Sequence, residues 1–301
     1  MAQSGTGDLP SANSKRATPR VTVICIFLNE ERFLREAIDS VLAQDLDDWE
    51  LVLVDDGSVD GSTGIALEFA ESDPRISYLA HPGHANLGMS ASRNIGAAAG
   101  SGEFVTFIDA DDRWPTDKLT HQLAIMDAHP EIAMTAGAIR YWDSWRGGED
   151  RIEHCGVVRG SVTPVPEALL GVYPLGKGGA AAVSALIRRS AYEAVGGFEE
   201  RFPGFYEDQA FFAKIYAQFP VLFSSALCQD YRQHDDSCCA RTEAAGLYLE
   251  KRSDLLKWLE GYAANLDTDW QPKLVAALHR EQRRLRWRKL RQALISLLGR
   301  S

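Results

Sequence analysis

The sequence of 301 residues has no uninterrupted apolar stretch long enough to span a lipid bilayer, which disfavours a transmembrane protein. Residues 1–20 have no hydrophobic centre, so we expect a disordered leader there and not a signal peptide. The five cysteines are odd in number and show no CxxC spacing, which argues against a disulfide framework and a zinc site. We therefore expect reduced cysteines and a cytoplasmic protein. The adjacent Cys238 and Cys239 are interpreted as a loop pair, with a redox role as the alternative.

A basic surface is also lacking over most of the chain. The net charge of −10 disfavours nucleic acid as a partner. The charge is uneven, because residues 279–301 contain eight Lys or Arg and one Glu. That segment carries +7 and leaves −17 on the other 278 residues, so its basic character needs a separate explanation.

The N-terminal half shows alternating strand and helix patterns. Residues 21–27 form an apolar, β-branched run, residues 31–44 have apolar side chains at helical spacing, and a second apolar run ends at Asp55 and Asp56. The alternation continues to a buried strand that ends near Asp109. Units of this kind form parallel sheets covered by helices. The pattern predicts an α/β, doubly wound half-domain.

Polar residues gather where three of the predicted strands end. These residues are Asn29 with Glu30, Asp55 with Asp56, and the cluster of Asp109, Asp111 and Asp112. Ligands of open α/β sheets bind at the carboxyl ends of the strands. Three polar strand ends in one sheet therefore predict one shared site.

The crowded carboxylates of the segment "FIDADD" need a cation, hydrogen bonds or water. Side chains two apart in a strand point the same way, so Asp109 and Asp111 can converge. Two converging carboxylates suit Mg²⁺ or Mn²⁺ shared with substrate phosphates. A solvated turn is the alternative, and we expect Asp112 to cap the helix that begins near Pro115.

Several other polar residues have both a functional and a structural interpretation. In "VDDGSVDGST" a carboxylate can accept a hydrogen bond from a base N–H, or the segment can be a simple turn. Arg93 can hold a diphosphate or base, or be a surface arginine. Glu207 and Asp208 open a predicted helix, where they can cap it or supply a general base. Arg232 and His234 can contact diphosphate or metal, or be structural.

Taken in order, these segments resemble the family 2 glycosyltransferases of the GT-A fold. The resemblance runs from about residue 21 to 237 through "VTVICIFLNEERFLREAIDSVLAQ", "ELVLVDDGSVDGST", "NLGMSASRNIGAAAGSGEFVTFIDADD", "DKLTHQL", "GGFEERFPGFYEDQAFFAKI" and "YRQHDDS". It implies an α/β fold with a Rossmann-like, nucleotide-binding half and a mixed central sheet. It also implies a catalytic domain over residues 21–240, followed by a basic helical extension over residues 241–301.

The resemblance also implies roles for individual residues. Asp208 would be the catalytic base, and Asp111 with His234 would bind a divalent metal, Mg²⁺ or Mn²⁺. Glu207 and Arg232 would face the diphosphate or the acceptor. The nucleotide would be bound by Phe27, Asn29, Glu30, Asp56, Arg93 and Asp109, with Asp56 on the base and Asp109 on the ribose side.

The implied reaction is inverting transfer of one sugar from a nucleotide-diphospho-sugar, a UDP-sugar, to a saccharide or lipid-linked saccharide. The setting would be cell-surface glycan biosynthesis. Two departures matter. The segment "QDYRQH" lacks the Trp of processive members, so we expect a non-processive enzyme, and "CIFLNEE" departs from the usual first strand end. The alternatives are a sugar nucleotidyltransferase, although "LNEERF" is no glycine-rich phosphate loop, and a non-catalytic nucleotide-sugar-binding protein.

The C-terminal segment "RRLRWRKLRQALISLLGR" reads as an amphipathic helix. Its apolar residues Trp287, Leu290, Leu294, Leu297 and Leu298 fall on one side, with most arginines around the others. This profile is typical of a helix that lies on anionic lipid. Packing against the acidic body or against a second subunit of a homo-oligomer is the alternative.

Overall fold

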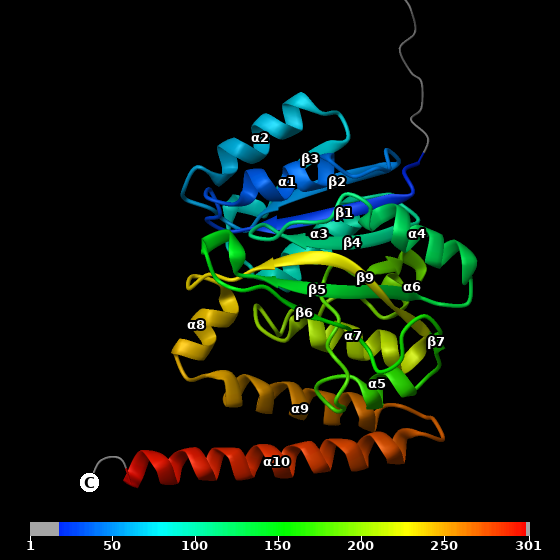
Figure 1. Cartoon of the computed structure of the whole chain (residues 1–301), viewed down its shortest axis with the longest axis vertical. Coiled ribbons are helices and arrows are strands. Elements are labelled where there is room, and N and C mark those ends of the chain that lie inside the picture. Colours follow the sequence, from blue (N-terminus) through cyan, green and yellow to red (C-terminus); the bar gives the residue numbers. More distant parts are fainter. Residues whose placement is uncertain (1–17, 299–301) are drawn as a thin grey trace, which may run out of the picture.

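The computed structural model describes residues 18–298 (Figure 1). Most of the predicted leader over residues 1–20 therefore lies outside the described residues. The first half of the chain forms four parallel strands, β1 (Val21–Phe27), β2 (Trp49–Asp55), β3 (Ile76–Ala80) and β4 (Phe104–Asp109). Their spatial order is β3-β2-β1-β4. All seven residues of β1 are buried, as expected for a strand with helices on both faces.

Alternation along β1 divides its side chains between two apolar cores. Ile24 and Ile26 face the core that contains α3 (Met89–Ala99), whereas Val23 and Cys25 face the core that contains α1 (Leu34–Leu42). Helix α2 (Ser62–Ser72) packs beside β3. The predicted strand and helix alternation of this half is therefore confirmed.

The sheet continues in mixed orientation through the second half of the chain. Strand β8 (Leu186–Arg188) is antiparallel to both β4 and β5 (Met134–Trp142), and β9 (Val221–Arg232) is parallel to β5. Strand β7 (Val162–Thr163) pairs with β9, and β6 (Arg151–Glu153) pairs with β5. The expected mixed central sheet is confirmed.

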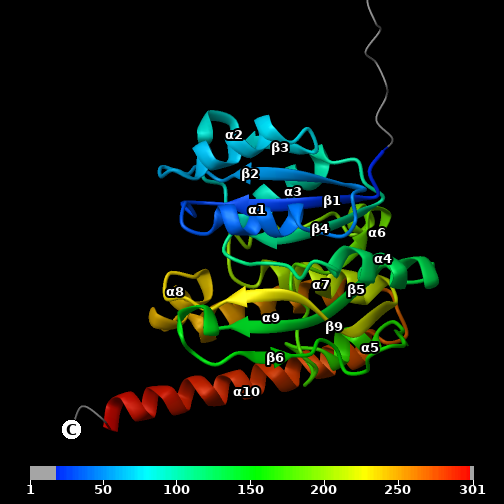
Figure 2. The same cartoon turned by 45° about the horizontal axis from the view of Figure 1, so that its top comes forward.

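Helices cover this half and extend its core. Its shorter helices are α4 (Lys118–Ala128), η2 (Ser144–Arg146), α5 (Glu167–Gly171) and α6 (Arg189–Ala194), and the first half contains one further short helix, η1 (Pro82–His84). They are followed by α7 (Glu207–Gln218), α8 (Cys238–Ala244), α9 (Tyr248–Ala264) and α10 (Gln271–Leu298). Helix α9 packs on α7, and α10 lies along the outside of α9 (Figures 1 and 2). Buried leucines of α9 and α10 belong to the same apolar core as α7. Within residues 18–298, no helix is both long and apolar enough to cross a membrane.

Two features of the second half were not predicted. The long strand β9 escapes pattern analysis because Ser224, Ser225 and the polar pair Gln229 and Asp230 interrupt its apolar run, and because it pairs irregularly with β5. The glycine-rich segment 144–179 contains β6, β7 and α5, which have no clear pattern in the sequence. These elements are short, so they provide little periodicity to detect.

Candidate active site

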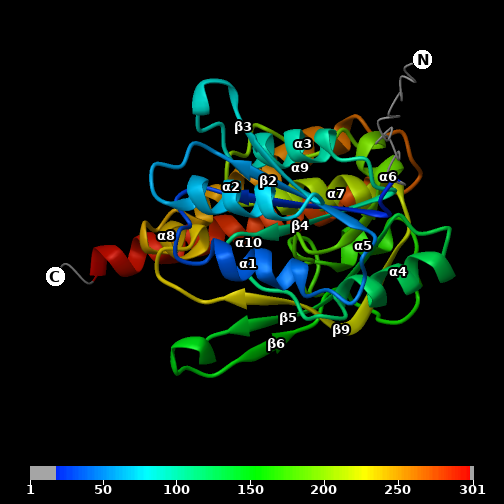
Figure 3. The ribbon, with the colours of Figure 1, turned by 90° about the horizontal axis from the view of Figure 1, so that it is seen from above.

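A cavity of about 1090 Å³ opens at the carboxyl ends of the parallel strands. The parallel strands β1, β2, β4, β5 and β9 end on the same side of the sheet, where α8 also lies (Figure 3). Eight of the predicted site residues line the cavity, namely Phe27, Glu30, Asp56, Arg93, Asp109, Asp111, Glu207 and Asp208. Asn29, Arg232 and His234 are not among its lining residues. The three polar strand ends therefore meet at one site, as the alternation predicted.

Asp56 lies in the cavity wall directly after β2. Its carboxylate accepts hydrogen bonds from the backbone N–H of Leu87 at 2.8 Å and of Gly88 at 3.0 Å. Gly88 has a φ of 88°, and a Cβ there would lie 2.7 Å from the Pro203 carbonyl oxygen. Only glycine fits this close approach. Asp56 thereby fixes the loop before α3 beside the end of β2.

Asn29 and Glu30 follow β1 but differ in placement. Asn29 has a left-handed φ of 57°, and its side-chain oxygen accepts a hydrogen bond from the Val59 N–H at 2.8 Å. Asn29 therefore joins the loops after β1 and β2. Glu30 lines the cavity, and burial, together with the nearby Asp111 carboxylate, raises its pKa to about 7.

Arg93 connects the end of β4 to the start of α7. Its guanidinium is 1% exposed and donates hydrogen bonds to Asp109 and Glu207, both at 2.7 Å. Burial raises the pKa of Asp109, although Arg93 opposes this shift. One oxygen of Glu207 is buried without a hydrogen-bond partner. Arg93 thus holds together two carboxylates that come from distant parts of the sequence.

Asp111 and His234 form the remaining polar corner of the site. The His234 Nε2 lies 2.9 Å from the Asp111 Oδ2, and the imidazole packs edge-on against Phe33 at 5.1 Å between ring centroids. Carboxylate oxygen and imidazole nitrogen are both suitable ligands for Mg²⁺ or Mn²⁺. Among the described residues, no group of three His, Cys, Asp or Glu side chains could hold a metal by itself. The pair therefore fits a cation whose remaining ligands come from substrate oxygens.

The Arg232 guanidinium donates its hydrogen bonds to other groups of the protein, including one of Asp111. Its Nε donates to the Asp111 carbonyl oxygen at 2.7 Å, and its Nη2 donates to Glu36 at 2.5 Å. The guanidinium also lies within 5.0 Å of the ring centroids of Phe33, Trp142 and Trp145, a cation–π arrangement. In this structure Arg232 orients the turn that carries Asp111, and its predicted contact with diphosphate or acceptor stays a prediction.

The prediction that Asp112 caps a helix is wrong. Helix α4 begins at Lys118, with Asp117 at its N-cap position. Asp112 is 0% exposed and accepts hydrogen bonds from the Arg232 N–H and from the Gln229 side chain. Burial and the neighbouring Asp111 and Asp109 raise its pKa well above the usual range. Asp112 therefore fastens the turn after β4 to the end of β9.

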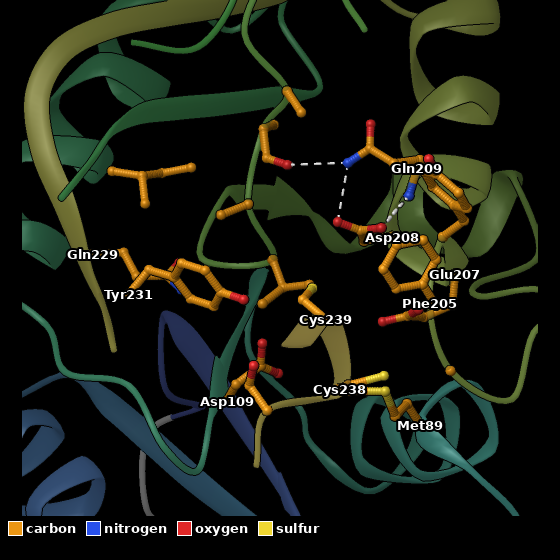
Figure 4. A pocket seen from close by; sticks show the side chains of 18 of the residues that line it. Met89, Asp109, Phe205, Glu207, Asp208, Gln209, Gln229, Tyr231, Cys238 and Cys239 are labelled. Carbon is orange, nitrogen blue, oxygen red and sulfur yellow. Dashed lines mark hydrogen bonds between the residues drawn. The ribbon is translucent and has the colours of Figure 1, made fainter. Parts of the chain in front are cut away.

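Asp208 occupies the first turn of α7 and faces the cavity (Figure 4). Its oxygens accept hydrogen bonds from the Gln209 N–H at 2.7 Å and from the Gln209 side-chain amide at 3.0 Å. Burial and then the adjacent Glu207 raise its pKa to about 7. A carboxylate with such a pKa can accept a proton near neutral pH.

The turn before Asp208 is strained and is held by hydroxyl groups. Phe205 and Tyr206 have left-handed φ values of 63° and 73°, each of which costs about 1–3 kcal/mol for a residue other than glycine. The Tyr206 hydroxyl lies 2.5 Å from that of Tyr173, which lies 3.0 Å from that of Tyr248. Arg252 of α9 donates to Tyr173 at 3.2 Å and pairs with Glu281 of α10 at 3.0 Å. These contacts connect the C-terminal helices to the position of Asp208.

Several lining residues were missed by sequence reasoning. Tyr231 at the end of β9 and the tyrosines that hold the turn before Asp208 line the cavity. The interpretation of Cys238 and Cys239 as a loop pair is wrong, because they begin α8 and also line the cavity, as free cysteines (Figure 4). For Tyr206, the aromatic content of "FPGFYEDQ" was an available signal.

Comparison with known protein families decides the classification of this chain. The model of the family described as glycosyl transferase family 2 matches residues 22–196. The chain belongs to glycosyl transferase family 2. The matched segment contains Asp56, Arg93, Asp109 and Asp111, whereas Asp208 and His234 follow it.

Curated relatives of this family 2 chain match parts of its length. Glycosyltransferase GlyA of Streptococcus pneumoniae is 44% identical over 93 residues, which are 31% of this chain and 13% of GlyA. An uncharacterized glycosyltransferase of Haemophilus influenzae is 36% identical over 125 residues, which are 42% of this chain and 49% of the relative. The chain therefore spans half or less of the length of these relatives.

Solved structures share the fold of this family 2 chain. S. aureus TarS in complex with UDP-GlcNAc matches with a TM-score of 0.68 and 19% identity, over 87% of this chain and 72% of that chain. The mannosyltransferase PcManGT from Pyrobaculum calidifontis, in complex with GDP-Man and Mn²⁺, matches with a TM-score of 0.59 and 18% identity. The match covers 94% of this chain and 81% of PcManGT. The predicted α/β, GT-A fold is confirmed.

Proposed function

We propose that this family 2 protein transfers a single sugar from a UDP-sugar to a hydroxyl of a saccharide or lipid-linked saccharide acceptor, with inversion at the anomeric carbon. The observation that carries the proposal is Asp208, a carboxyl with a pKa of about 7 in the wall of the cavity that also contains Asp109 and Asp111. A general base works best when its pKa is near the working pH.

Asp208 would act on the acceptor. Its carboxylate takes the proton of the attacking hydroxyl while that oxygen forms a bond to the anomeric carbon. The bond from that carbon to the diphosphate oxygen breaks, and its electron pair leaves with the nucleoside diphosphate. One displacement from the opposite face inverts the configuration, and holding both substrates in one cavity lowers the entropic cost.

The strand ends would bind the nucleotide. Asp56 accepts a hydrogen bond from an N–H of the nucleotide base. The backbone near Phe27 and Asn29 lies beside this base, and Glu30 lies near it. Asp109 contacts the ribose side. Arg93 acts by fixing Asp109, because its guanidinium already pairs with Asp109 and Glu207. Glu207 thereby supports the nucleotide site, and it lies next to Asp208, the proposed general base that faces the acceptor.

Asp111 and His234 would hold Mg²⁺ or Mn²⁺ together with the donor diphosphate. Such a cation, when bound, supplies a Lewis acid for the negative charge of the leaving group. Arg232 keeps the Asp111 turn in place through the Asp111 carbonyl oxygen. The complex of PcManGT with GDP-Man and Mn²⁺ agrees with a metal requirement in a protein of similar fold.

The donor and setting are proposed partly from the names of related proteins. The matched TarS structure was determined with UDP-GlcNAc, which supports a UDP-sugar. A Bacillus subtilis relative, TuaG, 36% identical over 110 residues, is named for teichuronic acid biosynthesis. This supports a role in cell-surface glycan biosynthesis. The absence of Trp from "QDYRQH" supports addition of one sugar per encounter.

A panel of nucleotide sugars tests the proposal. We expect one UDP-sugar to raise the melting temperature in the presence of Mn²⁺ and to be hydrolysed slowly to UDP and free sugar. No stabilisation by any nucleotide sugar, with or without metal, would refute the donor site. A nucleotidyltransferase would instead release pyrophosphate from a nucleoside triphosphate and a sugar phosphate. A protein that only binds nucleotide sugars would be stabilised by them but would neither hydrolyse them nor transfer the sugar to any acceptor.

A further inference from the structure

Helix α10 exposes a surface that the proposed function does not use. The helix packs inward through the buried Leu274, Leu278 and Leu285. At about 100 degrees per residue, a second set of side chains is centred about 160 degrees away from this buried side. We call this set the outer face of α10. It consists of Arg280, Arg283, Arg284, Trp287, Leu290 and Arg291, all exposed.

The outer face combines large apolar and basic side chains. Trp287 is 73% exposed and Leu290 is 57% exposed. A single exposed apolar residue is ordinary. A tryptophan and a leucine one turn apart among four arginines are typical of helices that lie in a lipid headgroup layer. The side chains of Leu294, Leu297 and Leu298, expected on the same side, lie outside the described residues.

A basic groove borders the outer face. It has a volume of about 520 Å³ and lies between α9 and α10. Its charged lining consists of Lys257, Arg283, Arg286 and Lys289, together with Glu260 and His279. Glu260 accepts a hydrogen bond from Gln282 at 3.0 Å and faces His279 at 3.6 Å. Four cations against one carboxylate favour an anion such as a lipid phosphate.

The charge of the rest of the chain gives the surface a direction. Residues 279–301 carry +7 and the other 278 residues carry −17. An anionic membrane attracts the first segment and repels the second. Figures 1 and 2 show that the C-terminal part of α10 projects beyond α9 on the side where β1, β5 and β9 end. Attachment through α10 would therefore keep the cavity side of the molecule beside the membrane.

We propose that the outer face of α10 and the adjoining groove dock on a membrane surface rich in anionic phospholipid. The arginines and lysines contact the lipid phosphates, and Trp287 and Leu290 enter the headgroup layer. Because no described helix could span a bilayer, this attachment is peripheral. It would bring the enzyme to the surface where a lipid-linked acceptor is found.

Vesicle sedimentation with the full chain tests this docking. We expect binding to vesicles of equal parts phosphatidylglycerol and phosphatidylcholine, no binding to pure phosphatidylcholine, and loss of binding in high salt. Each basic residue near an anionic surface contributes about fivefold to the partition coefficient, so Arg283→Gln combined with Arg291→Gln should lower it about 25-fold. Trp287→Ala should lower it at least several-fold.

Matched controls lie elsewhere on the surface. Arg159→Gln with Arg201→Gln removes two exposed charges outside α10, and Val158→Ala shortens a side chain that is 54% exposed. These variants should bind vesicles like the wild type. Stabilisation by the UDP-sugar should be the same in every variant, so a failure of docking is distinguishable from a failure of the proposed function.

Three results would overturn the proposal. Equal binding to both kinds of vesicle, or binding to neither, would exclude an anionic membrane as the occupant. Unchanged binding of the α10 variants would place the contact elsewhere. A dimer in light scattering that Trp287→Ala converts to a monomer would show that this face is covered by a second copy of the chain.

Discussion

The site contains two pairs of adjacent carboxylates that share one design. In the turn after β4, Asp112 is buried and accepts hydrogen bonds from Arg232 and Gln229, whereas Asp111 lines the cavity beside His234. At the start of α7, Glu207 is buried against Arg93, whereas Asp208 accepts hydrogen bonds from Gln209 and, among the described residues, from no other. In each pair one member fixes the backbone and the other is left for chemistry.

The two remaining carboxylates, Asp111 and Asp208, differ in their partners, and this difference underlies the separate roles proposed for them. Asp111 lies next to an imidazole, so a cation can join both groups. Burial and then the neighbouring Glu207 carboxylate disfavour the charged form of Asp208 and raise its pKa to about 7, although the hydrogen bonds from Gln209 oppose this shift. The first environment suits a metal ligand, and the second suits a proton acceptor.

Removing the proton acceptor should have the largest effect. Asp208→Asn keeps the size of the side chain but cannot accept a proton, so we expect the rate of sugar transfer to fall about 100- to 10,000-fold. Steady-state kinetics measure the loss, and the melting-temperature increase with UDP-sugar should persist. Transfer at the wild-type rate with donor bound would disprove the assignment of the base.

Removing the fixing partner in the same pair should act on stability. Glu207→Gln leaves the buried Arg93 with one charged partner, so the free energy of unfolding should fall by about 3 kcal/mol. Urea denaturation measures this change. Glu193→Gln, an exposed position on α6, is the control and should stay within about 0.5 kcal/mol of wild type. If Glu207→Gln and Glu193→Gln changed the free energy of unfolding equally, Glu207 would have no special role in fixing the backbone beside Asp208.

Removing the partner of Asp111 should weaken metal binding. We expect His234→Asn to lower the affinity for Mn²⁺, measured with UDP present, about 10- to 100-fold. His129→Asn is the control, because the His129 side chain pairs with Glu131 and does not line the cavity. An unchanged Mn²⁺ affinity would show that the Asp111 and His234 pair is structural.

A change of pH should have the smallest effect on the transfer rate of the changes considered, and it should act in opposite directions on the rate and on the stability. Because the proton acceptor must be ionised and its pKa is about 7, the transfer rate should rise about tenfold between pH 6 and pH 8. The same raised pKa means that the folded state binds this proton more tightly than the unfolded state does. Its contribution to stability is therefore present below the ordinary carboxyl pKa and is lost as the pH rises through about 7.

Comparison of Asp208→Asn with the wild type tests that sign. The variant should be the more stable protein at pH 8 and should lose this advantage at pH 4, as judged by urea denaturation at both values. A rate profile without an inflection near neutral pH, or a variant that is less stable at pH 8, would contradict the raised pKa.

The sequence predicted the strand ends better than the contacts between them. The apolar runs that end at Phe27, Asp55 and Asp109 are local patterns, and the rule for parallel sheets places their ends together. Strand β9 and its contacts with Asp112 were not predicted, because the partners are more than 100 positions apart, as with Gln229 at 117 positions. Likewise, Arg93 and Glu207 are separated by 114 positions. Which carboxylate of a pair is buried depends on such distant partners.

The link from Tyr206 through Tyr173 and Arg252 to Glu281 has a consequence for protein engineering. The segment matched by the family model ends at residue 196, and the predicted boundary of the catalytic domain lies at residue 240, so a shortened chain could be cut at either position. Either cut would remove Arg252 and Glu281, which support the strained turn before Asp208. A minimal catalytic unit, or a chimera with exchanged termini, must therefore retain α9 and α10 at least as far as Glu281.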